Sequence, residues 1–224
     1  MPPKLISRVK VVFFDAAGTL FYLPHGVGHH YAIIAARIGF LLDADKADLA
    51  FRRAWKDMPP PTPSRAPRPD DNRGWWRAVV DRVLDRCAVG DADREAYFSA
   101  LYSHFAGPGV WELFPETRAV LETAQRHHRL AVISNFDGRL RPILRDLEID
   151  GFFDDVLVSS EVGVDKPDPA IFSEALRRME VDPIEALHVG DDPVADWAGA
   201  EAAGMHVFRL ARPGNSLAGV LDLI

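Results

Sequence analysis

Short apolar runs rich in valine, isoleucine and phenylalanine alternate with amphipathic helical patterns along most of this chain, and this alternation constrains its fold more than any other feature. Each run is bounded by polar residues, which is typical of a buried strand. The runs cover residues 9–14, 130–133, 156–158, 186–189 and 206–208. Because parallel strands are joined by crossover connections that cover the sheet, the alternation predicts an α/β fold with a mostly parallel sheet covered on both faces.

The stretch from about Leu23 to Gly109 interrupts this alternation. It contains several helical patterns and no convincing strand, so we expect an inserted all-helical domain with helices over residues 29–38, 43–56, 73–87 and 91–105. Residues 59–69 are too rich in proline for helix or sheet and are expected to form an exposed, semi-rigid loop. The expected domains are a core at residues 1–21 and 110–224 and a helical insertion at residues 22–109.

Composition and charge exclude several classes of partner. The formal net charge is −7, whereas nucleic acids and anionic membranes are bound by clustered positive charge, so we expect neither as a partner.

No run approaches the ~20 apolar residues of a membrane span, and residues 1–8 lack the apolar stretch of a secretion signal, so a cytoplasmic location is expected. Cys87 is the only cysteine, which excludes an internal disulfide. The oligomeric state is left open.

Polar side chains follow three of the expected strands at the point where each strand ends: Asp15, Ser134 and Asp191. Because the carboxyl ends of parallel strands meet at one edge of a sheet, we expect these side chains in one crevice. Asp15 lies at a tight turn with Gly18 and Thr19 and could attack an electrophile. Carboxylates crowded near Asp15 repel one another unless a divalent cation lies between them, and a few fixed oxygen ligands suit Mg²⁺.

Two further aspartates follow Asp191. Asp192 can cap a helix whose first position is Pro193, and capping alone explains it. Asp196, one helical turn further, could support a metal through water or orient its neighbours, although a solvated helix position explains it nearly as well.

Ser134, Asn135 and Lys166 are candidate groups for binding a phosphate. The Ser134 hydroxyl and nearby backbone N–H groups could bind a phosphate oxygen with help from Asn135, and turn chemistry is the alternative explanation. Lysine is much rarer than arginine in this chain, so Lys166 beside Pro167 suggests a need for a compact ammonium rather than a planar guanidinium. Surface solvation is the alternative for Lys166.

In this order, Asp15, Ser134, Lys166 and Asp191 with Asp196 resemble the motifs of the haloacid dehalogenase superfamily of aspartate-nucleophile hydrolases. The helical insertion between the first two motifs is similar to the type-one cap of that superfamily. Residues 132–137 and 166–169 look like those of its rhythmically-expressed-gene-2-like group. The resemblance implies a three-layer Rossmann-like core, a mobile cap, a Mg²⁺ cofactor and an aspartyl-enzyme intermediate.

The resemblance also implies roles for individual residues. Asp15 would be the nucleophile and a metal ligand, and the Ala17 carbonyl and Asp191 would be further metal ligands. Ser134 and Lys166 would bind the phosphate. The remaining candidates are Asn135 as a substrate ligand and Asp192 and Asp196 as additional metal ligands.

Ala17 departs from the family pattern, because phosphatases of the superfamily have a second aspartate there that protonates the leaving alkoxide and later activates water. Loss of positioned acid–base catalysis typically costs ~10²–10⁴ in rate. A water molecule or one of His25, His29 and His30 could substitute.

We therefore expect a Mg²⁺-dependent phosphatase of a small phosphorylated molecule, impaired or restricted to leaving groups that need no proton, such as acyl or aryl phosphates. The alternative is a catalytically weak or inactive protein that binds a phosphoryl ligand. Two other hydrolases rank lower. Relatives that cleave a carbon–phosphorus bond carry alanine at this place but use a cap lysine, for which only Lys46 and Lys56 are candidates here. Dehalogenases usually have tyrosine at the position of Ala17.

Overall fold

The computed structural model describes residues 8–90 and 92–224, and the chain divides into two compact units. The first unit holds the chain up to Tyr22, Pro63–Arg68 and Trp111–Ile224, and the second holds Leu23–Thr62 and Pro69–Val110. Residues 1–7, which the sequence analysis assigned to the core and inspected for a secretion signal, lie outside the described residues. The same holds for Asp91, the first residue of an expected helix.

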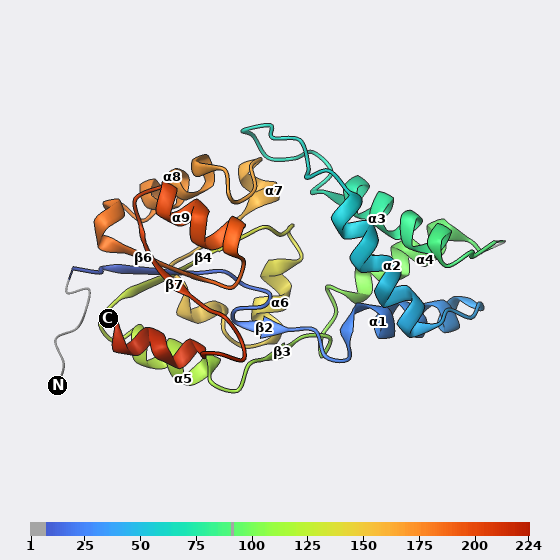
Figure 1. Ribbon diagram of the computed structural model, residues 1–224, viewed down its shortest axis with the longest axis horizontal. Helices are drawn as coiled ribbons and strands as arrows, with labels where there is room; N and C mark the ends of the chain where they lie inside the picture. The colour runs from blue at the N-terminus through green and yellow to red at the C-terminus, as the bar shows by residue number, and fades with distance from the viewer. Residues whose placement is uncertain (1–7, 91) are drawn as a thin grey trace. The chain divides into compact units, whose positions relative to one another are not determined.

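A five-stranded sheet runs through the middle of the first unit (Figure 1). Its strands, in spatial order and all parallel, are β5 (Asp155–Val158), β4 (Arg129–Ser134), β1 (Val11–Phe14), β6 (Ala186–Gly190) and β7 (His206–Arg209). Phe14 pairs with Val132 of β4 and with Val189 of β6, so these three strands end side by side. The α/β fold with a mostly parallel sheet is confirmed.

Side chains of β1 alternate between the two faces of the sheet. Val12 and Phe14 pack with α5 (Thr117–Ala124), α6 (Leu140–Asp146) and the 3₁₀-helix η4 (Leu217–Asp222). Val11 and Phe13 pack with α8 (Pro169–Arg178) and α9 (Gly199–Ala202) on the opposite face. The shorter helices of this unit are η1 (Asp150–Phe152), α7 (Ser159–Val162), η2 (Pro183–Glu185) and the π-helix η3 (Pro193–Ala198). The sheet is therefore the middle of three layers.

A second, antiparallel pair of strands consists of β2 (Phe21–Tyr22) and β3 (Glu112–Leu113). It joins the two positions at which the chain leaves and re-enters the first unit, and the Tyr22 hydroxyl donates to Glu112 Oε2 at 2.7 Å. The sequence analysis missed this pair, because two residues are too few to show the alternation that indicates a strand.

The second unit is formed by α1 (Gly26–Ile38), α2 (Ala44–Asp57), α3 (Arg73–Arg86) and α4 (Arg94–His104). Its own core contains Tyr31, Ile34, Val79 and Tyr97, all nearly fully buried. Helix α1 begins at Gly26, three residues before the expected start at residue 29. Its first turn contains Gly26 and Gly28, and glycine is unfavourable in a helix, so the sequence pattern did not indicate this turn. Gly28 lies so close to α2 that an added Cβ would be 2.0 Å from the Ala44 carbonyl oxygen.

The proline-rich residues 59–69 form no regular structure, as expected, and most of them are exposed. What the sequence did not show is that Pro63–Arg68 belong to the first unit. The Ser64 amide donates to the Gly163 carbonyl at 2.9 Å, and the Arg68 amide donates to the Ser160 carbonyl at 2.8 Å. In the part of the chain that the structure describes, no helix is long and apolar enough to cross a membrane.

The close contact at Gly28 predicts a position-specific loss of stability. Gly28→Ala should lower the free energy of unfolding by about 1–3 kcal/mol, because the new methyl group forces α1 and α2 apart. Gly90→Ala is the matched control in the same unit, since nothing lies within 4 Å of a Cβ placed there. Urea denaturation followed by circular dichroism measures both variants. Equal stability of the two would contradict the packing described here.

Candidate active site

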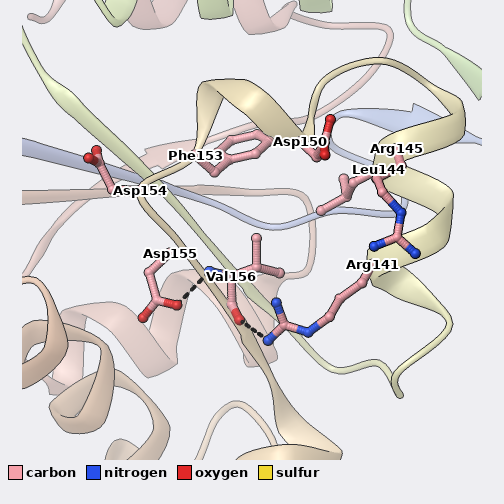
Figure 2. Close-up of a pocket in the computed structure, with 8 residues that line it drawn as sticks. All are labelled: Arg141, Leu144, Arg145, Asp150, Phe153, Asp154, Asp155 and Val156. Carbon is pink, nitrogen blue, oxygen red and sulfur yellow. Dashed lines mark hydrogen bonds between the residues drawn. The ribbon is translucent and has the colours of Figure 1, made fainter.

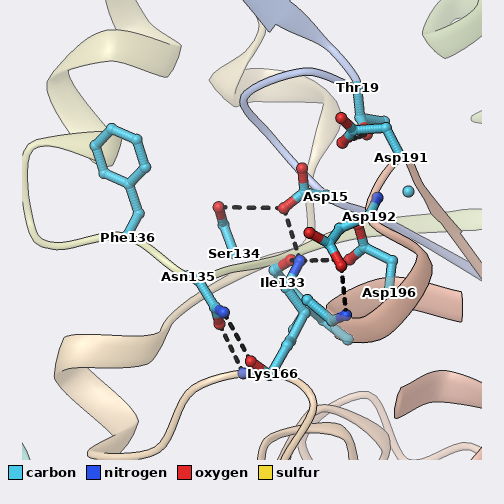
Figure 3. Close-up of polar contacts among 12 residues, drawn as sticks. Asp15, Thr19, Ile133, Ser134, Asn135, Phe136, Lys166, Asp191, Asp192 and Asp196 are labelled. Atoms are coloured by element: carbon cyan, nitrogen blue, oxygen red, sulfur yellow. Dashed lines mark hydrogen bonds and ion pairs between the residues drawn. The ribbon is translucent and has the colours of Figure 1, made fainter. Parts of the chain in front are cut away.

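The side chains of the candidate site come from the carboxyl ends of the three central strands. Asp15 directly follows β1, Ser134 is the last residue of β4, and Asp191 directly follows β6. Lys166 comes from the connection between α7 and α8 (Figure 3). The edge of the sheet predicted from the sequence therefore brings these four residues together.

Lys166 lies at the centre of this group. Its ammonium donates to Asp15 Oδ1 at 2.6 Å, to Asp196 Oδ1 at 2.6 Å and to the Ile133 carbonyl at 2.9 Å. Each of the three N–H bonds thus has an acceptor, and the side chain is only 2% exposed. The alternative of a solvated surface lysine is wrong. Burial alone would lower the pKa of Lys166, but Asp15 and Asp196 hold it above its usual range, so the ammonium stays charged.

Asp15 is buried beside this ammonium. Ser134 Oγ donates to its Oδ1 over a long 3.4 Å contact, so the hydroxyl, the ammonium and the carboxylate converge on one point. Burial and the charge of Asp196 together raise the pKa of Asp15 to about 6, against the opposing effect of Lys166. Because burial disfavours the charged form of Asp15, a nearby cation would stabilise that form.

Asn135 holds the main chain of Lys166 in place. Its Oδ1 accepts from the Lys166 amide at 2.7 Å, and its Nδ2 donates to the Lys166 carbonyl at 2.8 Å. The loop that follows is braced by a bidentate ion pair in which Arg139 donates to both Asp137 oxygens at 2.8 and 2.7 Å. Asn135 therefore supports the lysine, in addition to any contact with a substrate.

Asp191 is approached closely by the turn after β1. Thr19 Oγ1 donates to Asp191 Oδ1 at 3.2 Å, and a Cβ on Gly18 would lie 2.6 Å from Asp191 Oδ2. Gly18 also has a φ of +95°, so both its conformation and its surroundings require glycine. Burial raises the pKa of Asp191, and the charge of Asp196 adds to this effect.

Asp196 is buried, which excludes the solvated helix position considered from the sequence. Its Oδ1 accepts from Lys166 and from His188 Nε2 at 2.9 Å, and its Oδ2 accepts from the Asp192 amide at 3.0 Å. Burial would raise the pKa of Asp196, but Lys166 and His188 outweigh it and hold the pKa below the usual range. The carboxylate is therefore charged and fixed by direct contacts.

His188 is a functional candidate that the sequence analysis missed. It is fully buried in β6, and burial lowers its pKa, so the neutral ring donates its Nε2–H to Asp196. The available signal was a polar residue within an apolar strand, but the strand pattern does not show what a histidine contacts.

Asp192 is exposed and caps η3. Its Oδ1 accepts from the Val194 amide at 2.8 Å and from the Ala195 amide at 2.7 Å. The capping interpretation accounts for it, and the structure does not bring Asp192 into the carboxylate cluster proposed for the metal.

The cluster itself consists of Asp15, Asp191 and Asp196, whose ligand oxygens all lie within 4.8 Å of one another. Three carboxylates and one ammonium leave two net negative charges, which a divalent cation would neutralise. Oxygen donors in this number suit Mg²⁺ or a similar hard cation, so the residues fit the expected cofactor. Ala17 lies two residues past Asp15 and contributes no side chain to the cluster.

The three histidines considered as substitutes for the missing aspartate belong to the second unit. His30 is buried, its Nε2 lies 3.0 Å from the Pro24 carbonyl, and its Nδ1 lies 2.9 Å from His104 Nε2. Because a carbonyl only accepts, Nε2 carries the proton and His104 donates to Nδ1. His30 is therefore engaged on both ring nitrogens, whereas His25 is exposed and His29 is partly buried.

A cavity of about 240 Å³ lies at the amino end of β5, which is the opposite edge of the sheet (Figure 2). Asp150, Asp154 and Asp155 line it, and Arg141 donates to the Val156 carbonyl there at 3.0 Å. Arg141 is also paired with Glu161. Arg145 also lines this cavity, whereas Asp15 and Lys166 do not. The carboxylate cluster, where a buried ammonium contacts two of three converging carboxylates, is therefore the better candidate site.

Comparison with known proteins identifies relatives along nearly the whole chain. The mouse (Mus musculus) "haloacid dehalogenase-like hydrolase domain-containing protein 3" is 36% identical over 207 residues, which cover 91% of this chain and 82% of the relative. The Drosophila melanogaster "rhythmically expressed gene 2 protein" is 28% identical over 216 residues, covering 90% and 82%. A Methanopyrus kandleri "glyceraldehyde 3-phosphate phosphatase" is 50% identical over 66 residues, covering 30% and 28%.

Among solved structures, a defluorinating L-2-haloacid dehalogenase aligns with a TM-score of 0.77 and 20% identity, covering 99% of this chain and 89% of that chain. At this identity the likeness supports the fold alone. The family model "haloacid dehalogenase-like hydrolase" matches residues 9–204. These matches confirm the resemblance found in the motifs: the chain belongs to the haloacid dehalogenase-like hydrolases.

Proposed function

We propose that this chain is a Mg²⁺-dependent phosphatase that transfers a phosphoryl group to Asp15. The observation that carries the proposal is the convergence of Asp15, Asp191 and Asp196 with Lys166 at one edge of the sheet. The family supports hydrolysis, and the Methanopyrus relative, named as a phosphatase, supports a phosphate ester as substrate. Because a net charge of −7 disfavours nucleic acids and anionic membranes as partners, we further propose a small phosphorylated molecule as the substrate. A cytoplasmic location is part of the same proposal.

In this proposal Asp15 and Asp191 would hold the cation, together with the Ala17 carbonyl that the family resemblance implies and with Asp196 beside them. When bound, the cation would offset the negative charge of both the cluster and the substrate. Lys166 and Ser134 supply the positive charge and the hydroxyl donor that bind phosphoryl oxygens and keep the phosphorus close to Asp15.

The proposed reaction has two displacements. An Asp15 oxygen forms a bond to phosphorus, and the ester P–O bond breaks so that its electron pair leaves with the alcohol oxygen. A water molecule then attacks phosphorus, the bond to Asp15 breaks, and the carboxylate is regenerated as inorganic phosphate departs. Because Ala17 has no acid, the leaving oxygen of the first step must depart as an anion, which favours acyl and aryl phosphates.

The alternatives rest on weaker observations. Lys46 and Lys56 are exposed on α2, whereas a Schiff-base lysine needs a desolvated environment, so a carbon–phosphorus hydrolase is disfavoured. A dehalogenase would need no acid either, and the shared fold keeps a 2-haloacid as a comparison substrate in the assays. A binding protein with little turnover would retain the site and its affinity for phosphate.

The nucleophile proposal predicts slow, Mg²⁺-dependent hydrolysis of 4-nitrophenyl phosphate, measured by release of 4-nitrophenolate. Asp15→Asn should abolish it, because the amide is a poor nucleophile of nearly the same shape. Chelation of the metal by EDTA should stop the reaction, and added Mg²⁺ should restore it. Activity retained in Asp15→Asn would contradict the mechanism. Release of halide from a 2-haloacid, with no phosphate released, would favour the dehalogenase.

Position 17 predicts a selective gain of activity. Ala17→Asp should raise the hydrolysis rate of an alkyl phosphate by ~10²–10⁴, because it restores an acid for the alkoxide. The aryl phosphate rate should also rise, because the new carboxylate can activate water, but the ratio of the alkyl to the aryl rate should increase, since only the alkoxide needs the acid. Ala17→Asn is the matched control, with the same shape and no ionisable proton. Release of inorganic phosphate from both substrates measures the ratio. If Ala17→Asp and Ala17→Asn behave alike, or if Ala17→Asp is inactive on both substrates, the assignment of this position is wrong.

A further inference from the structure

The proline-rich segment Pro63–Arg68 lies against α7 and the loop that leads from it to Lys166. Two main-chain hydrogen bonds join them, from the Ser64 amide to Gly163 at 2.9 Å and from the Arg68 amide to Ser160 at 2.8 Å. The segment is thus attached to the first unit, although the chain on both sides of it belongs to the second.

Gly163 makes this close approach possible. A Cβ there would lie 2.1 Å from the Ala66 carbonyl oxygen and 2.5 Å from Ser64 Oγ, both impossible distances for a real methyl group. Its φ of +86° is also in the region that favours glycine. The loop is therefore shaped to receive the segment.

A buried ion pair completes the contact. Arg68 donates to both Asp165 oxygens, at 3.3 Å from Nη1 and 2.5 Å from Nη2, and the two side chains are only 7% and 16% exposed. A bidentate pair fixes orientation as well as distance. Removing one partner leaves the other charge buried, which is strongly destabilising.

Asp165 directly precedes Lys166, and Asn135 bonds both the amide and the carbonyl of Lys166. The main chain at Lys166 is therefore held directly by Asn135, and Arg68 holds the preceding residue through the side chain of Asp165. Pro63 and Pro67 restrict the unbound conformations of the segment, which lowers the entropy lost when it docks.

We propose that Arg68 is a positioning residue that acts through Asp165 to hold Lys166 in register with Asp15. The effect on catalysis rests on the function proposed above, whereas the docking of the segment does not. A residue far outside the recognised motifs thereby contributes to phosphate binding.

Two measurements test this inference on the full-length chain. Trypsin cleavage after Arg65, followed by mass spectrometry, reports release of the segment, since the Arg65–Ala66 bond lies between its two anchoring hydrogen bonds. The inhibition constant of inorganic phosphate against 4-nitrophenyl phosphate hydrolysis, or direct calorimetry where turnover is too slow, reports the Lys166 site.

Arg68→Ala and Asp165→Asn should each speed this cleavage about tenfold, because proteolysis follows the population of the open state. They should also weaken phosphate binding about tenfold and lower kcat/KM about tenfold, which is a typical cost of losing an orienting partner. Arg68→Lys should lie between, since it keeps the charge without the bidentate geometry. Gly163→Ala should release the segment without removing either charge. Lys10→Ala, which breaks an exposed ion pair with Glu185 just before β1, is the control and should change neither measurement.

Unchanged cleavage in Arg68→Ala and Asp165→Asn would overturn the docking role of the ion pair. Faster cleavage with unchanged phosphate affinity would show that the ion pair anchors the segment without affecting Lys166, and would overturn the positioning role of Arg68. If the natural chain neither hydrolyses the aryl phosphate nor binds phosphate, the proposed function and the positioning role both fail. The cleavage rates still decide whether Arg68 anchors the segment.

Discussion

The buried ammonium of Lys166 is the interaction on which the candidate site depends. A charge with 2% exposure is unfavourable unless its donors are all satisfied, and here a carboxylate on each side and the Ile133 carbonyl satisfy them. The same contacts hold Asp15 and Asp196 close despite their repulsion. A guanidinium presents a planar fork and could not direct three bonds to these converging acceptors, which explains a lysine in a chain that favours arginine.

The sequence predicted the parts of the site that follow from strand ends. Asp15, Ser134 and Asp191 each come after an apolar run, and parallel topology alone brings such residues to one edge. Asp196 could not be placed in this way, because it lies within η3 and not at the end of a strand. The partner of His188 was equally hidden within its strand.

The docking of the proline-rich segment lies beyond local sequence signals for a different reason. Proline content predicted irregular, exposed chain, and most of the residues are exposed. The ion pair that anchors it joins Arg68 to Asp165 across 97 positions, and neither residue stands in a pattern that indicates a partner. Gly163, with its positive φ, is the one sequence feature at the contact. It does not identify the contact, because an ordinary turn at this position would also require glycine. Contacts of this kind depend on the completed fold.

In the proposed function, the site binds charge and delivers a proton, and Ala17 affects only the second of these tasks. Charge binding needs Asp15, Asp191 and Lys166, and these are all present and in contact range, whereas proton delivery to the leaving group needs an acid that position 17 lacks. A site with two net negative charges repels any anionic substrate unless a cation is bound, so the retained carboxylates have a use in phosphoryl transfer that halide release does not require. In the function proposed above, the acidic cluster is therefore an argument for phosphoryl transfer over halide release.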